Sequence, residues 1–147
     1  MLIGIDARMT PGLLRCLAAM GHGDELVVTD ANYPAAATAR HCAVTRPLTL
    51  PGLDAPAAIA MITSLLPLDG FTDYAALRME IDNAPEQMGD VHNEAWAILK
   101  PRLPEGGRLA SIERQAFYAQ ARKAFAVVQT TEARAFGCFI LRKGVVF

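Results

Sequence analysis

The chain has 147 residues, of which 52% are hydrophobic and 20% are charged, and its net charge is -1 at pH 7. This length and composition predict one domain over residues 1–147 with a substantial apolar core. The near-zero charge argues against nucleic acid or an anionic membrane surface as partners, and no apolar run reaches the ~18 residues of a membrane helix.

The first predicted elements lead to a distinctive segment. Thr10 and Pro11 form a helix start, an N-cap followed by proline, and leucines then recur at helical spacing until Gly21. The apolar, β-branched residues 26–29 follow as a buried strand. Residues 34–43 are rich in alanine and predict a helix for which Asp30 or Asn32 is the cap, and residues 44–50 predict a short strand.

The second half continues the alternation of helices and strands. Asp54 caps a predicted helix that reaches Leu65 and is apolar nearly all round, so we expect it to be buried. Apolar and charged residues alternate over 76–81, as in a half-exposed strand. The remaining predicted elements are a helix over 85–100, a helix that opens at Ser111, a strand over 126–130, and a closing strand over 136–141 before an apolar tail.

This order of elements predicts the fold class. Helices and strands alternate without a repeat or a linker, which is typical of a three-layer α/β domain. We therefore expect a largely parallel sheet with helices on both faces.

Residues 21–34 hold the first candidate functional groups. His22 stands between two glycines, and an imidazole can donate and accept protons near neutral pH, although a loop histidine can simply bond a carbonyl. Asp30 ends the strand, where α/β sheets place ligands, but Asp-x-Asn segments also form turns. A strand advances about 3.3 Å per residue, so the two side chains meet only if the glycine loop folds back, or if a neighbouring subunit completes the site.

The block Gly21–Pro34 resembles the sugar mutarotase family that includes ribose pyranase and L-fucose mutarotase. Members carry a Gly-His-x-Asp loop, a hydrophobic strand and an Asp-Ala-Asn-aromatic-Pro turn. Residues 131–138 resemble the carboxyl-terminal Thr-Gly-Glu-x-Arg-x-Tyr-(Gly/Ala)-Asn motif of the family, but Phe136 replaces the usual tyrosine and Cys138 the usual asparagine. Both replacements remove a group that could hydrogen-bond a sugar.

The resemblance implies roles for six residues. His22 is the expected acid/base, and Asp30 and Arg114 are expected ligands of sugar hydroxyls, although Arg114 could instead be a solvated ion-pair partner. Phe136, Gly137 and Cys138 are expected to form a further wall, with a backbone contact at Gly137. The aromatic residues Trp96, Tyr33 and Tyr118 could stack on a sugar, but isolated aromatics more often belong to the core.

The implied function is the interconversion of anomers or ring forms of a free monosaccharide, with L-fucose favoured over D-ribose and no cofactor. The family forms decameric rings, so we expect a homo-oligomer. The alternatives are a non-catalytic sugar-binding or regulatory relative, favoured by the two replacements, and a structural ring protein without a ligand.

The cysteines bear on location and on metals. Cys16, Cys42 and Cys138 are widely spaced and odd in number, which favours free thiols in a reducing cytoplasm. The first residues lack a basic stretch followed by a long apolar one, so we expect no secretion signal. No close Cys/His pairing suggests a metal site.

Overall fold

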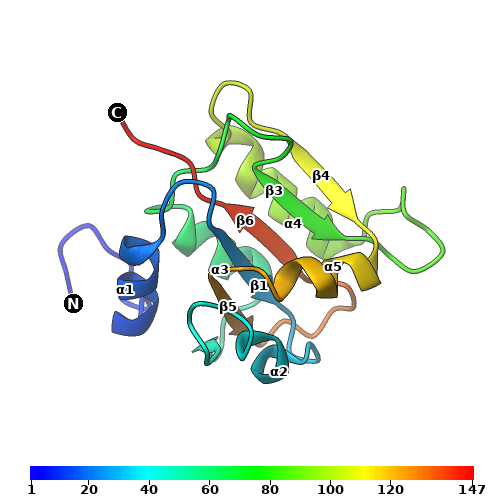
Figure 1. The fold of residues 1–147 in the computed structure, drawn as a ribbon, viewed down its shortest axis with the longest axis horizontal. Coiled ribbons are helices and arrows are strands. Elements are labelled where there is room, and N and C mark those ends of the chain that lie inside the picture. Colours follow the sequence, from blue (N-terminus) through cyan, green and yellow to red (C-terminus); the bar gives the residue numbers. More distant parts are fainter.

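Six strands form one mixed sheet in the order β2-β5-β1-β6-β3-β4 (Figure 1). The computed structural model describes residues 1–147. Strand β6 is antiparallel to its neighbours β1 and β3, whereas the other pairs are parallel, so β6 alone runs against the rest. The prediction of a largely parallel sheet is confirmed. The strands are β1 (Glu25–Thr29), β2 (Leu48–Leu50), β3 (Ala76–Met79), β4 (Leu109–Ile112), β5 (Ala126–Thr130) and β6 (Phe139–Arg142).

Helices cover both faces of the sheet, as expected. Helices α1, α3 and α4 contribute to one apolar cluster, and α2 and α5 contribute to the other. No helix combines the length and the apolar character that crossing a membrane requires. The helices are α1 (Pro11–Ala19), α2 (Ala35–Ala39), α3 (Ala55–Ile62), α4 (Asp90–Leu99) and α5 (Arg114–Ala121), with a 3₁₀ turn η1 (Lys100–Arg102).

The alternation of side chains along the strands separates the two clusters. In β1, Leu26 and Val28 face the α1/α3/α4 side, and Val27 faces the α2/α5 side. In β6, Phe139 and Leu141 face the first side and Ile140 the second. Successive residues of a strand point to opposite faces, so the central strands must be apolar at every position to be buried by both helical layers.

Two predictions around the outer strands were wrong. Ser111 lies in strand β4 rather than at a helix start, and the α5 cap is Glu113, whose carboxylate accepts the Ala116 N–H. The β3 strand is buried at all four positions rather than half-exposed, and Arg78 is only 6% exposed. The Arg78 guanidinium donates to the Pro85 carbonyl at 2.7 Å, so the loop after β3 covers a position that the charge pattern assigned to solvent.

Other elements are shorter than predicted. Helix α2 has five residues and no side-chain cap, because Asp30 instead accepts the N–H groups of Asn32 and Tyr33 within the turn. Strand β2 has three residues, and α4 begins at Asp90. The predicted buried helix after Asp54 is confirmed, because six of the eight residues of α3 are buried.

Candidate functional site

A small pocket lies where β1 and β3 end and β6 begins. It has a volume of about 200 Å³. It therefore joins the carboxyl edge of the parallel strands to the loop that enters β6, the edge at which α/β sheets place ligands. Its lining includes four of the predicted site residues, Asp30, Arg114, Phe136 and Cys138, together with Asn32, Tyr33, Met79, Tyr118 and Ala135.

Asp30 presents one free oxygen at this pocket. The side chain is 8% exposed, and its Oδ1 accepts the N–H groups of Asn32 at 3.0 Å and Tyr33 at 2.9 Å. Its Oδ2 accepts no N–H or O–H group of the chain, although the Cys138 thiol lies close enough to hydrogen-bond the carboxylate. The turn-forming role and the ligand role of Asp30 are therefore compatible, because each uses a different oxygen.

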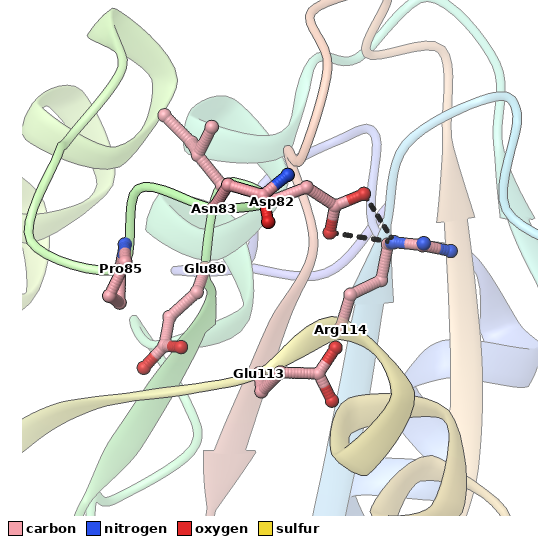
Figure 2. Close-up of a pocket in the computed structure, with 7 residues that line it drawn as sticks. Glu80, Asp82, Asn83, Pro85, Glu113 and Arg114 are labelled. Carbon is pink, nitrogen blue, oxygen red and sulfur yellow. Dashed lines mark hydrogen bonds and ion pairs between the residues drawn. The ribbon is translucent and has the colours of Figure 1, made fainter.

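Arg114 is held chiefly through its Nε, which leaves most of its terminal donors unused. Its Nε donates to both carboxylate oxygens of Asp82, at 2.9 and 3.0 Å, as Figure 2 shows. The Asp82 hydrogen bond raises the pKa of Arg114, so the guanidinium stays charged. The terminal Nη groups point away from Asp82 in Figure 2, and on that side the guanidinium has only Tyr118 of the pocket lining as a side-chain partner. They are donors available to a ligand.

Arg114 also borders a second, polar cavity of about 420 Å³. Glu80, Asp82 and Glu113 are among its lining residues (Figure 2). The Glu80 carboxylate accepts the Ser111 hydroxyl at 2.7 Å, and Glu113 caps α5. Glu80 and Glu113 thus have structural partners within the chain. Asp82 holds the Nε of Arg114, a residue that also lines the smaller pocket.

Phe136 and Cys138 form the wall opposite α5. Cys138 is 1% exposed, and its sulfur accepts the Asp30 N–H at 3.5 Å. Burial raises the pKa of the Cys138 thiol well above its ordinary value, so the group is a neutral thiol. Gly137 lies between the two residues and admits no side chain, because a Cβ there would lie 2.7 Å from Cγ of Glu132.

Glu132 and Arg134 hold the loop that carries this wall. The Glu132 carboxylate is 2% exposed and accepts the Ala55 N–H together with three N–H groups of Arg134. The Arg134 side chain, with help from the backbone N–H groups, lowers the pKa of Glu132 to about 2. Ala31 donates its N–H to the Glu132 carbonyl at 2.9 Å. The loop is thereby tied to the Asp30 turn.

His22 lies at the opposite end of the sheet, just before the amino end of β1. Gly23 donates its N–H to the carbonyl of Lys143, just beyond the end of β6, and adopts a φ of 85° that favours glycine. The imidazole Nε2 lies 3.0 Å from Oδ1 of Asp69, and the ring packs edge-on against Phe71 at 5.6 Å. The His22 side chain is 45% exposed.

Asp69 is the partner of His22, and no sequence pattern identifies it, since 47 residues separate the two. Its side chain is fully buried. Burial favours a higher pKa, but hydrogen bonds from Thr72, His22 and the Phe71 N–H outweigh it, and the pKa of Asp69 falls below its ordinary value. An ionised Asp69 accepts a hydrogen bond from the Nε2–H of His22. Nδ1 is then the ring nitrogen that can exchange a proton with a ligand.

One chain therefore does not bring all the predicted residues together. Asp30, Arg114, Phe136 and Cys138 line one pocket, whereas His22 contacts Asp69 and Phe71 at the amino end of β1. The glycine loop does not fold back along the sheet. Of the three aromatic candidates, Tyr33 and Tyr118 line the pocket, and Trp96 belongs to the core.

Comparison with known proteins gives relatives that span the whole chain. Human (Homo sapiens) fucose mutarotase is 39% identical over 146 residues, which cover 97% of this chain and 93% of that protein. The crystal structure of FucU from Bifidobacterium longum has a TM-score of 0.88 and 31% identity, covering 98% of this chain and 99% of that one. Fucose mutarotase from Streptococcus pneumoniae in complex with L-fucose has a TM-score of 0.84 and 29% identity, covering 99% and 100%.

A family model agrees with these relatives. The model described as the RbsD / FucU transport protein family matches residues 3–146. The match includes the His22 loop, the Asp30 turn and the loop before β6. The chain belongs to the RbsD / FucU family.

Proposed function

We propose that this protein is a sugar mutarotase that interconverts the anomers of a free monosaccharide, with L-fucose as substrate and D-ribose as the second choice. The observation that carries the proposal is the whole-length similarity to the fucose mutarotases, one of which is seen with L-fucose bound. The pocket adds chemistry that suits a sugar: a free carboxylate oxygen, free guanidinium donors and aromatic rings.

His22 is the proposed acid/base. Opening a sugar ring requires a proton to reach the ring oxygen and another to leave the anomeric hydroxyl, and an imidazole performs both transfers near pH 7. With Nε2 bonded to Asp69, the proton moves through Nδ1. Asp30 Oδ2 and the Arg114 Nη groups are the proposed ligands of the sugar hydroxyls, with Phe136, Gly137 and Cys138 as the wall. This chemistry needs no cofactor.

We further propose that a second copy of the chain completes the site. A strand of five residues separates His22 from Asp30, and it spans about 16 Å at 3.3 Å per residue. The pocket of about 200 Å³ is smaller than the ~300–1,000 Å³ typical of ligand pockets. Phe71, which packs on His22, is 67% exposed and offers an apolar surface to a neighbour. The resemblance implies a decameric ring. A closed ring would bring the surface around His22 of one copy against the surface around Asp30 of the next.

The second candidate function is non-catalytic binding of a monosaccharide. Phe136 and Cys138 favour it, because they lack the hydroxyl and the amide that the family motif commonly places there. The buried Cys138 thiol is already a partner of the Asp30 N–H and gives a ligand no replacement for that amide. We place the protein in the cytoplasm in either case, since its three cysteines are free and buried.

Exchange NMR on the anomeric protons of L-fucose, with D-ribose alongside, tests the proposal. We expect the protein to accelerate anomer exchange with one of these sugars. The substitution His22→Ala removes the acid/base and should lower the rate by about 10²–10⁴-fold, while L-fucose still binds. Binding without acceleration by the unmodified protein would instead establish the non-catalytic reading.

A further inference from the structure

The backbone of Phe136 adopts an unusual conformation at the pocket wall. Its φ is 60°, in the left-handed region that residues other than glycine seldom enter. Such a conformation persists only when surrounding contacts enforce it. The Phe136 carbonyl has two such contacts: it accepts the Cys138 N–H at 2.8 Å and His92 Nε2 at 2.9 Å.

His92 is built as a fixed donor to that carbonyl. It lies on α4 and is fully buried, with its ring edge-on against Phe139 at 5.9 Å. The Gly89 N–H donates to its Nδ1 at 3.1 Å, so the ring proton must be on Nε2. Burial lowers the pKa of His92, the bond to Phe136 opposes this shift, and the charge of Arg78 adds to it. The imidazole is therefore neutral, with one defined tautomer.

The position of His92 determines the direction of the Gly137 N–H, which follows the Phe136 carbonyl in the chain. His92 contacts Phe139 on the α1/α3/α4 face of the sheet, whereas Tyr33, Met79 and Cys138 of the pocket belong to the α2/α5 cluster. In a planar trans peptide the C=O and the following N–H point in opposite directions. A Phe136 carbonyl drawn toward His92 thus turns the Gly137 N–H toward the pocket face.

The Gly137 N–H makes no hydrogen bond within the chain, although Gly137 is buried. Buried backbone N–H groups are nearly always paired, so this group lacks a partner that a ligand could supply. We infer that His92 is a positioning residue, which holds the peptide between Phe136 and Gly137 so that the Gly137 N–H donates to an oxygen of the bound sugar. This inference rests on the proposed function and adds His92 to its machinery.

The test exploits a unique dipeptide. Phe136–Gly137 is the one Phe-Gly pair in the sequence. Carbonyl-¹³C phenylalanine combined with ¹⁵N glycine gives a single HNCO peak, which reports the carbonyl bonded to His92 and the unpaired N–H of Gly137. We expect this peak to shift saturably as L-fucose is added to the unmodified protein. A peak that stays in place at saturating L-fucose would overturn the inference.

Variants separate positioning from general destabilisation. His92→Asn cannot reach Phe136 with a donor and should lower kcat/KM by about tenfold, the value of about one hydrogen bond. His92→Gln carries an amide donor near the Nε2 position and should recover most of that loss. Leu99→Ala, in the same helix and buried, should lower stability while leaving kcat/KM and the sugar-dependent peak shift unchanged.

The outcomes distinguish the inference from the function on which it rests. If the unmodified protein accelerates anomer exchange and folded His92→Asn retains its kcat/KM and peak shift, the positioning role is wrong and the function stands. If the unmodified protein neither binds nor exchanges either sugar, the proposed function fails and the role of His92 fails with it. If His92→Asn does not fold, two other measurements test the inference. A saturable peak shift of the unmodified protein and a nearly unchanged kcat/KM of His92→Gln would support the positioning role, and a fixed peak would overturn it.

Discussion

At the scale of single residues, His22 depends on a neighbour that no local pattern reveals. The sequence singles out the histidine by its flanking glycines, but the carboxylate that fixes its tautomer lies in the loop before β3. The network extends further, because Thr72 donates to Asp69 and accepts from Arg142, which bonds the buried Glu25. The imidazole therefore stands on a rigid polar support, which favours one ring orientation.

This support yields a residue-scale prediction. In Asp69→Asn, an amide of the same shape replaces the carboxylate and no longer requires the proton on Nε2 of His22. We expect kcat to fall by about tenfold or more, with a smaller effect on L-fucose affinity. Anomer-exchange NMR and a binding titration measure the two quantities. An unchanged kcat would mean that Asp69 only packs the loop.

At the scale of elements, the loop between β5 and β6 is held by a buried charge rather than by a surface pair. Glu132 and Arg134 are only two residues apart, but Glu132 is buried, because α3 and α4 border this loop. Glu132 also receives the Ala55 N–H at the start of α3, and Arg134 reaches Glu94 on α4 at 2.8 Å. The site wall is thus anchored to two helices.

The anchoring predicts a dependence of stability on pH. The pKa of Glu132 is lower in the folded protein, about 2, than its ordinary value of 4.5, so its contribution is complete above pH 4.5 and is lost as the pH falls toward 2. Glu132→Gln should cost about 1–3 kcal/mol at pH 7 and flatten the loss of stability in acid. Urea unfolding at pH 7, 4 and 3 measures this, with the exposed Glu86→Gln as control. Parallel pH profiles for Glu132→Gln and the unmodified protein would contradict the assignment.

Local patterns predict elements well where caps and periodicity agree, and fail where long-range pairing decides. The Thr10-Pro11 and Asp54 signals give α1 and α3, with both side-chain caps present. Ser111 resembles a cap, but pairing with β3 makes residues 109–112 a strand. Arg78 resembles a surface residue, but it is buried and donates to the Pro85 carbonyl in the loop after β3. Likewise, the family motifs identify Asp30 and Cys138 as candidate site residues. Their contact could not be predicted in this way, because 108 residues separate them and only the fold brings them together.

At the scale of the whole molecule, the proposed site residues lie at two opposite ends of the sheet. The proposed acid/base, His22, lies beside the amino end of β1, and the proposed ligands of the sugar surround its carboxyl end. The exposed apolar side chains include Phe71 beside His22 and the terminal residues Ile3, Val146 and Phe147. Surfaces of this kind are common at contacts between subunits. An isolated chain is therefore expected to lack a complete site.

Subunit complementation tests this account most directly. His22→Ala removes the proposed acid/base from one end of the sheet, and Arg114→Ala removes a proposed sugar ligand from the other. Each variant alone should therefore be strongly impaired in L-fucose anomer exchange. When equal amounts are unfolded and refolded together, random assembly gives about one quarter of the sites both intact residues. If neighbouring copies share each site, the activity should recover toward about a quarter of the unmodified rate. A mixture no more active than the mean of the two separate variants would show that each site lies within one chain, and would contradict the account.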